Sequence, residues 1–227
     1  MNCAIIMAAG KGKRMKADIN KQFILIKDKP ILAYTIEKFE KNSFIDQIVI
    51  VAAPEEVNFC KSEIVYKYSF KKVKKIVCGG KERQDSVLNG LIAAKESDIV
   101  LIHDGARPFV DNRIISSGIE YAKLYGGAAC GMAPKDTIKV KKSDGFSERT
   151  IDRSKLFCVQ TPQCFKYEEI LKAHMYAKEK NIPATDDTML FEMAGNRVYL
   201  YEGSYNNIKI TTPEDLYSAE KLIDSGY

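Results

Sequence analysis

The chain begins with an apolar segment that passes directly into a glycine-rich, basic loop, Ile5-Ile6-Met7-Ala8-Ala9-Gly10-Lys11-Gly12-Lys13-Arg14-Met15. The continuously apolar run from Cys3 to Met7 is typical of a buried parallel strand. Small residues after a strand let a ligand approach the backbone closely, and bare N–H groups beside several cations form an anion site. Together with Lys21, which follows shortly, this stretch predicts a binding site for a polyphosphate.

Outward from this loop, apolar runs of strand length alternate with segments of helical periodicity. We expect strands at 48–52, 75–78, 99–103 and 128–133, and helices at 31–39, 83–94 and 114–125. The alternation predicts an α/β fold, a Rossmann-like, doubly wound, mostly parallel sheet with helices on both faces. Ligands of such sheets bind outside the carboxyl ends of the strands. The loop, Gly79-Gly80 and Asp104 all follow predicted strands, so we expect them to converge on one crevice.

The alternation is interrupted over residues 136–153. Polar and apolar residues alternate from Thr137 toward Ser143-Asp144-Gly145, which is a β-hairpin signal. We expect a β-arm that projects from a single domain spanning 1–227, with strand edges that favour pairing with a second copy of the chain. After the arm we expect a core strand at 157–160, helices at 167–180, 188–193 and 213–223, and short strands at 198–201 and 208–210.

Composition limits the function classes. The 227 residues include 35 basic and 30 acidic ones, which gives a net charge of +5. This charge does not by itself indicate binding to nucleic acid. The densest basic run, 67–75, is best interpreted as a solvated surface. Six cysteines form no C-x-x-C pair and there are only two histidines, so we expect no zinc site. No apolar run reaches membrane-spanning length and no signal peptide is recognisable, so we expect a cytoplasmic protein without membrane or nucleic-acid partners.

A series of short motifs runs through nearly the whole chain. They are Ala8-Ala9-Gly10-x-Gly-x-Arg14-Met15, Lys21-Gln22, Gly79-Gly80-x-Glu82-Arg83-x-Asp85-Ser86-Val87, His103-Asp104-Gly105-Ala106-Arg107-Pro108, Asp136-Thr137-Ile138-Lys139, Thr161-Pro162-Gln163 and Asn207-Ile208-Lys209-Ile210-Thr211. Each is weak alone, but in this order they resemble the 2-C-methyl-D-erythritol 4-phosphate cytidylyltransferase family of the non-mevalonate isoprenoid pathway. The resemblance implies that CTP and methylerythritol phosphate react to give the cytidyl diphosphate product and pyrophosphate, with Mg²⁺.

The residues suit this chemistry independently of the resemblance. The nucleophile is a phosphate oxygen of the acceptor, which is ionised near neutral pH, so neither a Ser–His–Asp nor a Cys–His arrangement is needed. The protein must align two mutually repelling polyanions and stabilise the charge that develops on the α-phosphorus and the leaving pyrophosphate. Cationic side chains and Mg²⁺ do this in phosphoryl-transfer enzymes.

The resemblance implies roles for individual residues on the nucleotide side. Arg14, Lys21 and Lys209 match catalytic cations that bind the triphosphate. The nucleotide site is implied to comprise Ala8, Ala9, Gly10, Gly12, Gly79, Gly80, Lys81, Ser86 and Ala106. Lys81 departs from the acid that some relatives carry at this position. Asp104 matches the Mg²⁺ ligand, whereas Asn206 stands where some relatives have a second acid.

The acceptor side includes the arm. The resemblance implies that methylerythritol phosphate is bound by Arg107, Thr137, Arg153 and Thr211, together with Lys209. It also implies a homodimer through the 136–153 arm, in which Thr137 and Arg153 reach into the neighbouring subunit. An arginine and a lysine around one phosphate are chemically sensible, because arginine can bind two of its oxygens at once.

Three other readings remain open. A ribitol 5-phosphate cytidylyltransferase shares most of the motifs, although Ala8-Ala9-Gly10 and Thr150-Ile151-Asp152-Arg153 favour the methylerythritol type. A nucleotide-sugar pyrophosphorylase that uses UTP or dTTP would differ in nucleotide preference. A non-catalytic nucleotide-binding protein on the same fold is the third, since fold does not determine function. The intact set Arg14, Lys21, Asp104 and Lys209 argues against it.

Overall fold

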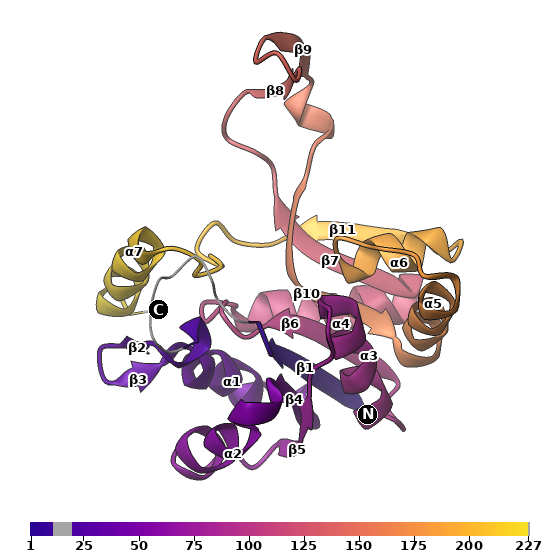
Figure 1. Cartoon of the computed structure of the whole chain (residues 1–227). Helices are drawn as coiled ribbons and strands as arrows, with labels where there is room; N and C mark the ends of the chain where they lie inside the picture. The colour runs from indigo at the N-terminus through magenta and orange to yellow at the C-terminus, as the bar shows by residue number, and fades with distance from the viewer. Residues whose placement is uncertain (11–19, 227) are drawn as a thin grey trace.

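The computed structural model describes residues 1–10 and 20–226. Within these residues, seven strands form one sheet in the order β11-β7-β10-β6-β1-β4-β5 (Figure 1). The strands β5 (Val73–Cys78), β4 (Gln47–Ala52), β1 (Asn2–Ala8) and β6 (Ile99–Asp104) are parallel, as are β7 (Gly127–Met132) and β11 (Val198–Glu202). The strand β10 (Cys158–Lys166) is antiparallel to both β6 and β7. The predicted Rossmann-like, mostly parallel α/β fold is confirmed.

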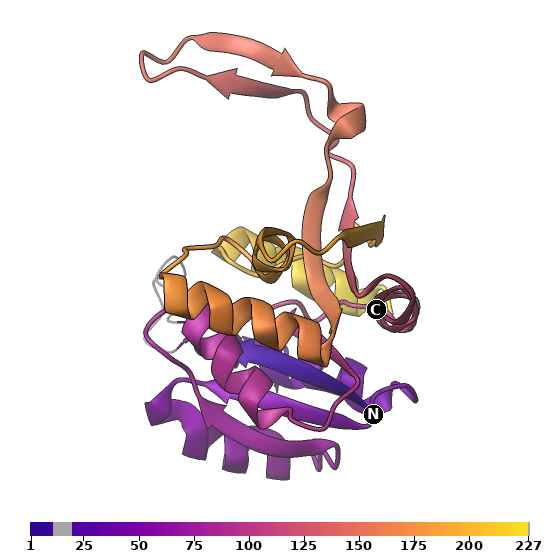
Figure 2. The same cartoon turned by 90° about the vertical axis from the view of Figure 1, so that its right-hand side faces the viewer.

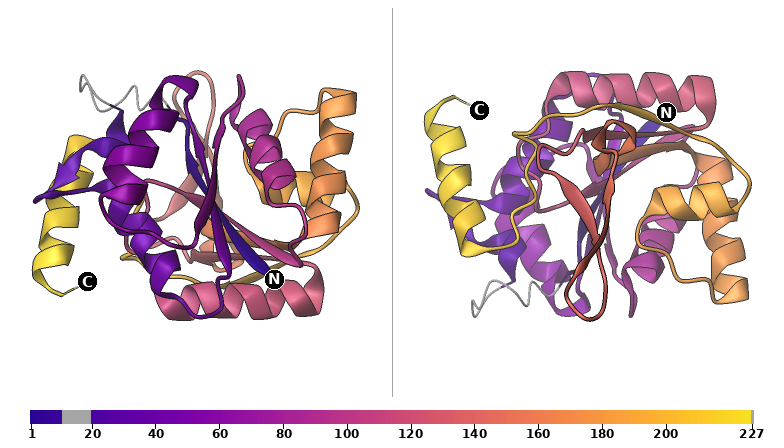
Figure 3. Two further views of the ribbon diagram at one scale, coloured as in Figure 1. Left: turned by 90° about the horizontal axis from the view of Figure 1, so that it is seen from below. Right: turned by 90° about the horizontal axis from the view of Figure 1, so that it is seen from above.

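Helices cover both faces of this sheet (Figure 3). One face packs on α1 (Ile31–Lys41), α4 (Asn112–Tyr125) and the π-helical segment Cys60–Tyr66, and the other on α3 (Arg83–Ala93), α5 (Tyr167–Lys180) and α6 (Asp187–Met193). Strand β1 serves both faces: Ala4 and Ile6 join one apolar cluster, and Cys3 and Ile5 join the other. This follows from the period of two by which strand side chains alternate between faces.

A smaller apolar cluster joins the C-terminal helix to the body. Helix α7 (Pro213–Asp224) packs near the short strands β2 (Leu25–Ile26) and β3 (Lys29–Pro30), with Ile26, Ile31, Phe109, Ile210 and Ala219 buried between them. The prediction of a strand at 208–210 is wrong. Those residues are irregular backbone, in which the Ile210 N–H donates to the Ala106 carbonyl at 2.9 Å. This backbone bond does not make a strand ladder.

The segment after β4 is a succession of a 3₁₀ turn (Pro54–Glu56), the short α2 (Val57–Phe59) and the π-helical segment. One other predicted element differs in extent. The strand expected at 157–160 continues to Lys166, and its pairing with β7 shifts register between Val159 and Gln163. The motif Thr161-Pro162-Gln163 therefore lies inside a core strand, where it contacts the end of β6.

The predicted arm is present as the antiparallel hairpin of β8 (Ile138–Lys141) and β9 (Ser147–Ile151). It projects well away from the sheet and its helices (Figures 1 and 2). A 3₁₀ turn, Arg153–Lys155, lies at its base, and Phe146 at its tip is 74% exposed. In the part of the chain that the structure describes, no helix is long and apolar enough to span a membrane.

Candidate active site

A cavity of about 570 Å³ opens at the carboxyl ends of the parallel strands. It is lined by Met7, Ala9, Gly10, Lys21, Gln22, Gly80, Lys81, Glu82, Arg83, Ser86, Asp104, Gly105, Ala106 and Lys209. These residues come from the end of β1, the turn after the loop, the start of α3, the end of β6 and the segment before α7. The predicted convergence of the loop, the glycine pair and Asp104 on one crevice is thus seen for the described residues.

The glycine pair lets the cavity walls approach each other. A Cβ atom on Gly79 would lie 2.6 Å from the Ala9 Cβ, and one on Gly80 would lie 2.2 Å from the Asp85 Cβ. The Gly80 N–H donates to the Ser86 Oγ at 2.9 Å, and that hydroxyl donates to the Glu82 carbonyl at 3.0 Å. Close packing therefore requires glycine at both positions, and the turn presents backbone and small side chains to a ligand.

The turn that carries Lys21 is clamped from two sides. Gln22 is 1% exposed, and its Nε2 donates to the Ala8 carbonyl at 2.6 Å and to Glu56 Oε2 at 3.2 Å. Asn20 also donates its side-chain amide to Glu56. Lys21 itself donates from Nζ to the Ile210 carbonyl at 3.3 Å. These bonds tie the end of β1, the Lys21 turn and the segment before α7 into one wall.

Asp104 is the carboxylate at the centre of this wall. Its Oδ2 lies 2.8 Å from Lys209 Nζ and 3.5 Å from Arg107 Nε. Burial raises the pKa of this carboxyl, but the charges of Lys209 and Arg107 outweigh burial and hold the pKa well below its ordinary value. Asp104 is therefore ionised throughout the physiological range, and it offers a hard oxygen ligand at the edge of the cavity.

A hydrogen-bonded relay positions Asp104 and Arg107. The Thr161 Oγ1 accepts the Asp104 N–H at 3.1 Å and lies 3.1 Å from His103 Nδ1, while His103 Nε2 lies 3.0 Å from the Arg107 carbonyl. Desolvation of the fully buried ring lowers the pKa of His103 to about 4. The ring is therefore neutral at pH 7, and Nε2 is its donor while Nδ1 accepts.

Of the predicted acceptor residues, only Lys209 lines the cavity in the described part of the chain. Arg107 contacts Asp104 and donates from Nη1 to the Asn207 carbonyl at 2.6 Å, but it does not line the cavity. The Thr211 hydroxyl donates to Asp215 Oδ2 at 2.9 Å, where it supports the start of α7. Thr137 and Arg153 are exposed at the base of the arm, away from the cavity.

Four more of the predicted positions are Gly12, Arg14, Asn206 and Ala8. Gly12 and Arg14 lie outside the described residues. Asn206 does not line the cavity, and its N–H donates to the Ser204 Oγ at 3.1 Å. Ala8 is 2% exposed and does not line the cavity, and its carbonyl accepts from Gln22, which does.

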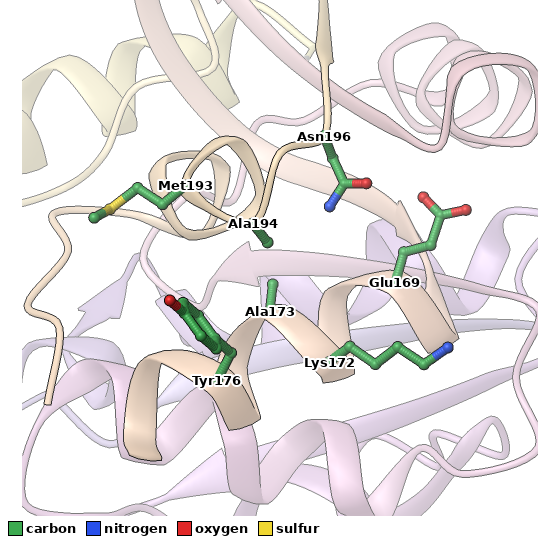
Figure 4. A pocket seen from close by; sticks show the side chains of 7 residues that line it. All are labelled: Glu169, Lys172, Ala173, Tyr176, Met193, Ala194 and Asn196. Carbon is green, nitrogen blue, oxygen red and sulfur yellow. The ribbon is translucent and has the colours of Figure 1, made fainter. Parts of the chain in front are cut away.

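A second cavity, of about 470 Å³, lies between α5 and α6. It is lined by Glu169, Lys172, Ala173, Tyr176, Met193, Ala194 and Asn196 (Figure 4). No residue of any sequence motif contributes to it. Its place on the helical layer, away from the ends of the parallel strands, separates it from the predicted site.

Comparisons with known proteins agree on one family. The family model described as IspD, 2-C-methyl-D-erythritol 4-phosphate cytidylyltransferase, matches residues 2–225. The chain belongs to the IspD family. A relative from Clostridium acetobutylicum with that enzyme name is 72% identical over 223 residues, which cover 98% of this chain and 97% of the relative. One from Clostridium novyi is 59% identical, covering 99% and 97%.

Solved structures of IspD-family proteins have the same fold. The 4-diphosphocytidyl-2C-methyl-D-erythritol synthase of Anaerococcus prevotii aligns with a TM-score of 0.86 at 30% identity, covering 98% of this chain and 96% of that one. The Francisella tularensis IspD structure aligns with a TM-score of 0.81 at 29% identity, covering 97% and 98%. The family resemblance of the sequence motifs is thereby confirmed.

Sequence reasoning assigned no role to several residues that line the cavity of this IspD-family chain. They are Met7, Gln22, Glu82, Arg83 and Gly105. Four of them are adjacent to a predicted site residue in the sequence, and Arg83 lies two positions after Lys81. Their place in or beside the motifs could therefore have indicated these residues. The motifs do not, however, show the direction in which each side chain points.

Proposed function

We propose that this chain is a cytidylyltransferase that joins CTP to 2-C-methyl-D-erythritol 4-phosphate, giving 4-diphosphocytidyl-2-C-methyl-D-erythritol and pyrophosphate. The observation that carries the proposal is the cavity itself. In a chain of the IspD family, it combines a narrow glycine- and alanine-lined wall with Lys21, Lys209 and the ionised Asp104. Such a cavity fits a nucleoside triphosphate, with the base against the small residues and the phosphates near the cations.

The reaction is an in-line displacement. An oxygen of the acceptor phosphate attacks the α-phosphorus of CTP, a new P–O bond forms, and the bond from the α-phosphorus to the bridging oxygen breaks, which releases pyrophosphate. No side chain needs to remove a proton, because the attacking oxygen is already ionised. Lys21 and Lys209, with Arg14 of the loop, stabilise the charge on the transferring and leaving phosphates.

The donor set fits Mg²⁺ as a companion of the nucleotide. Among residues 1–10 and 20–226, no group of three or more His, Cys, Asp or Glu side chains could hold a metal ion. Mg²⁺, however, is usually held by one or two carboxylates together with substrate phosphates and water, and Asp104 is one such carboxylate at the cavity wall. When bound, the ion would neutralise charge on the triphosphate. Lys209 Nζ lies 2.8 Å from Asp104 Oδ2, an oxygen of the carboxylate that would bind the ion.

The acceptor site is proposed to lie between two chains. Arg107 and Lys209 stand beside Asp104, whereas Thr137 and Arg153 are exposed on the projecting arm. A second copy whose arm reaches over the cavity would bring both groups around one acceptor phosphate. This arrangement predicts a homodimer that is needed for activity.

Product analysis with matched substrates tests the function. The purified chain is incubated with MgCl₂, CTP and either methylerythritol phosphate or ribitol 5-phosphate, and pyrophosphate release is followed, with UTP replacing CTP as the nucleotide control. We expect pyrophosphate only with CTP and methylerythritol phosphate. Faster release with ribitol 5-phosphate would assign the other acceptor, preference for UTP would assign another nucleotide class, and CTP binding without release would indicate a non-catalytic protein.

A further inference from the structure

Asp187 is a buried carboxylate that the proposed chemistry does not use. It is the first residue of α6, and its side chain is 1% exposed. Its Oδ2 accepts from Arg83 Nη2 at 2.7 Å, and its Oδ1 lies 3.1 Å from His174 Nε2. Its N–H donates to Gln163 Oε1 at 3.1 Å. These bonds hold Asp187 in place, and in the described part of the chain none of the three joins it to a predicted site residue.

The partner of this carboxylate reaches the active-site cavity. Arg83 is the first residue of α3 and lines the cavity with Lys81, Ser86 and Asp104. Its side chain is 38% exposed, so the guanidinium is bound at one end and accessible in part. A guanidinium carries several N–H donors in a rigid fork that suits phosphate oxygens, and one nitrogen, Nη2, is engaged by Asp187.

The electrostatics are consistent with a permanently charged pair. Burial raises the pKa of Asp187, but Arg83 and His174 outweigh it, so the pKa of this carboxyl lies below its ordinary value. Burial lowers the pKa of Arg83, and Asp187 and Asp104 reverse that effect and raise it. Arg83 and Asp187 are therefore both charged at neutral pH.

Stability alone does not account for this arrangement. Apolar residues of similar volume are often as stabilising as a buried ion pair, because both charges must be desolvated. An ion pair does what an apolar contact cannot: it holds a long, flexible, charged side chain in one orientation. The contacts run from His174 on α5 through Asp187 on α6 to Arg83 on α3, so three separate helices fix one cation at the cavity wall. Figure 4 shows α5 and α6 side by side, with Ala173 of α5 facing Ala194 just after α6.

We propose that Asp187, supported by His174, is a positioning residue that holds Arg83 at the cavity wall, where Arg83 binds an anionic oxygen of the nucleotide triphosphate. The inference rests on the proposed function, because it takes CTP as the ligand. It adds a cation to the nucleotide side, with the buried network that places it. The contrasting reading is that the ion pair only joins α3 to α6.

Calorimetric measurement of the Kd for CTP with Mg²⁺ tests the inference in Asp187→Asn, Arg83→Met and the double variant. We expect Asp187→Asn to weaken CTP binding about tenfold, as loss of a charge-assisted contact does, with an unchanged KM for methylerythritol phosphate. The double variant should bind CTP no more weakly than Arg83→Met, because Asp187 acts through Arg83. If Arg83→Met alone fails to fold with its carboxylate left unpaired, the double variant, which removes both charges, replaces it.

The matched control breaks an ion pair elsewhere. Glu37→Gln removes the 2.9 Å pair between Glu37 on α1 and Lys29 on β3, outside the cavity, and should leave the Kd for CTP unchanged. A Kd for CTP in Asp187→Asn equal to that of the wild type, with a lowered melting temperature, would overturn the inference and establish a structural role. So would a double variant whose loss equals the product of the two single losses.

The same measurements separate the inference from the proposed function. A wild-type protein that binds CTP but releases no pyrophosphate with any acceptor would overturn the function, and the Kd series would still decide the role of Asp187. Normal turnover with an unaltered Kd in Asp187→Asn would overturn the inference alone. A wild-type protein that does not bind CTP would overturn both.

Discussion

The cavity and the arm carry the two halves of the predicted site, and they are built in opposite ways. The cavity lies at the ends of buried parallel strands, and its residues are held by ion pairs and hydrogen bonds, as with Asp104 and Lys209. The arm is a two-stranded hairpin with mostly exposed side chains, and it carries Thr137 and Arg153 at its base. An isolated hairpin is marginally stable in water. The comparison teaches that one chain preorganises the nucleotide side, while the acceptor side depends on what the arm contacts.

The largest effect should come from the cavity. Lys21→Ala should lower kcat roughly a hundredfold to a thousandfold, because a cation that stabilises transition-state charge is lost. Steady-state pyrophosphate release with circular dichroism as a folding check measures this. Lys74→Ala, at an exposed lysine of β5 that bonds to the Lys71 carbonyl and does not line the cavity, is the control. Turnover near wild type in Lys21→Ala would remove that residue from the chemistry.

The arm should matter through the partner chain. Arg153→Ala should lower activity roughly a hundredfold, as loss of an arginine from a charged contact does. An equal mixture of Lys21→Ala and Arg153→Ala chains, unfolded and refolded together, should recover about a quarter of the wild-type activity. Half of randomly paired dimers are mixed, and one of their two sites combines an intact cavity with an intact arm. Recovery would be absent if each arm served its own chain, and a fully active monomer would refute the dimer.

An effect of intermediate size is expected on the free energy of unfolding, and it comes from His103. The folded-state pKa of His103 is about 4, below the unfolded value of about 6.5, so the unfolded chain binds more protons between those values. The stabilisation is complete above about pH 6.5 and falls by about 3 kcal/mol as the pH drops to 4. Urea unfolding from pH 7 to 4 measures it. The dependence of the free energy of unfolding on pH should be weaker in His103→Gln. A pH-independent free energy of unfolding in the wild type would contradict the lowered pKa of His103.

The smallest effect is expected on the stability of the arm, from a substitution in its hairpin turn. Gly145 has φ of +93° with nothing within 4 Å of an added Cβ, so Gly145→Ala costs only backbone strain, about 1 kcal/mol. Hydrogen exchange of the β8 and β9 amides should accelerate while CTP binding is unchanged. Gly79→Ala is the contrasting variant: its Cβ would meet Ala9 at 2.6 Å, so it should weaken CTP binding. Equal effects of the two variants on CTP binding would break the comparison.

Local patterns in the sequence determined much of this protein. Apolar runs and helical periodicity predicted the parallel strands and the helices, because these elements bury one face or both. The turn residues Ser143-Asp144-Gly145 predicted the hairpin, because such turns are specified locally. The order of short motifs identified the family and named most residues of the cavity, including Asp104 and Lys209.

Only the tertiary structure decided which side chains meet. The antiparallel direction of β10 and the irregular segment around Lys209 depend on pairing partners far away in the sequence, which periodicity does not encode. The bond from Arg83 to Asp187 joins residues 104 positions apart. Nothing local in either residue indicates that one lies at the cavity and the other beneath it. A charged side chain interacts with the groups that the fold places within a few ångströms of it. Its partner is therefore determined by tertiary packing.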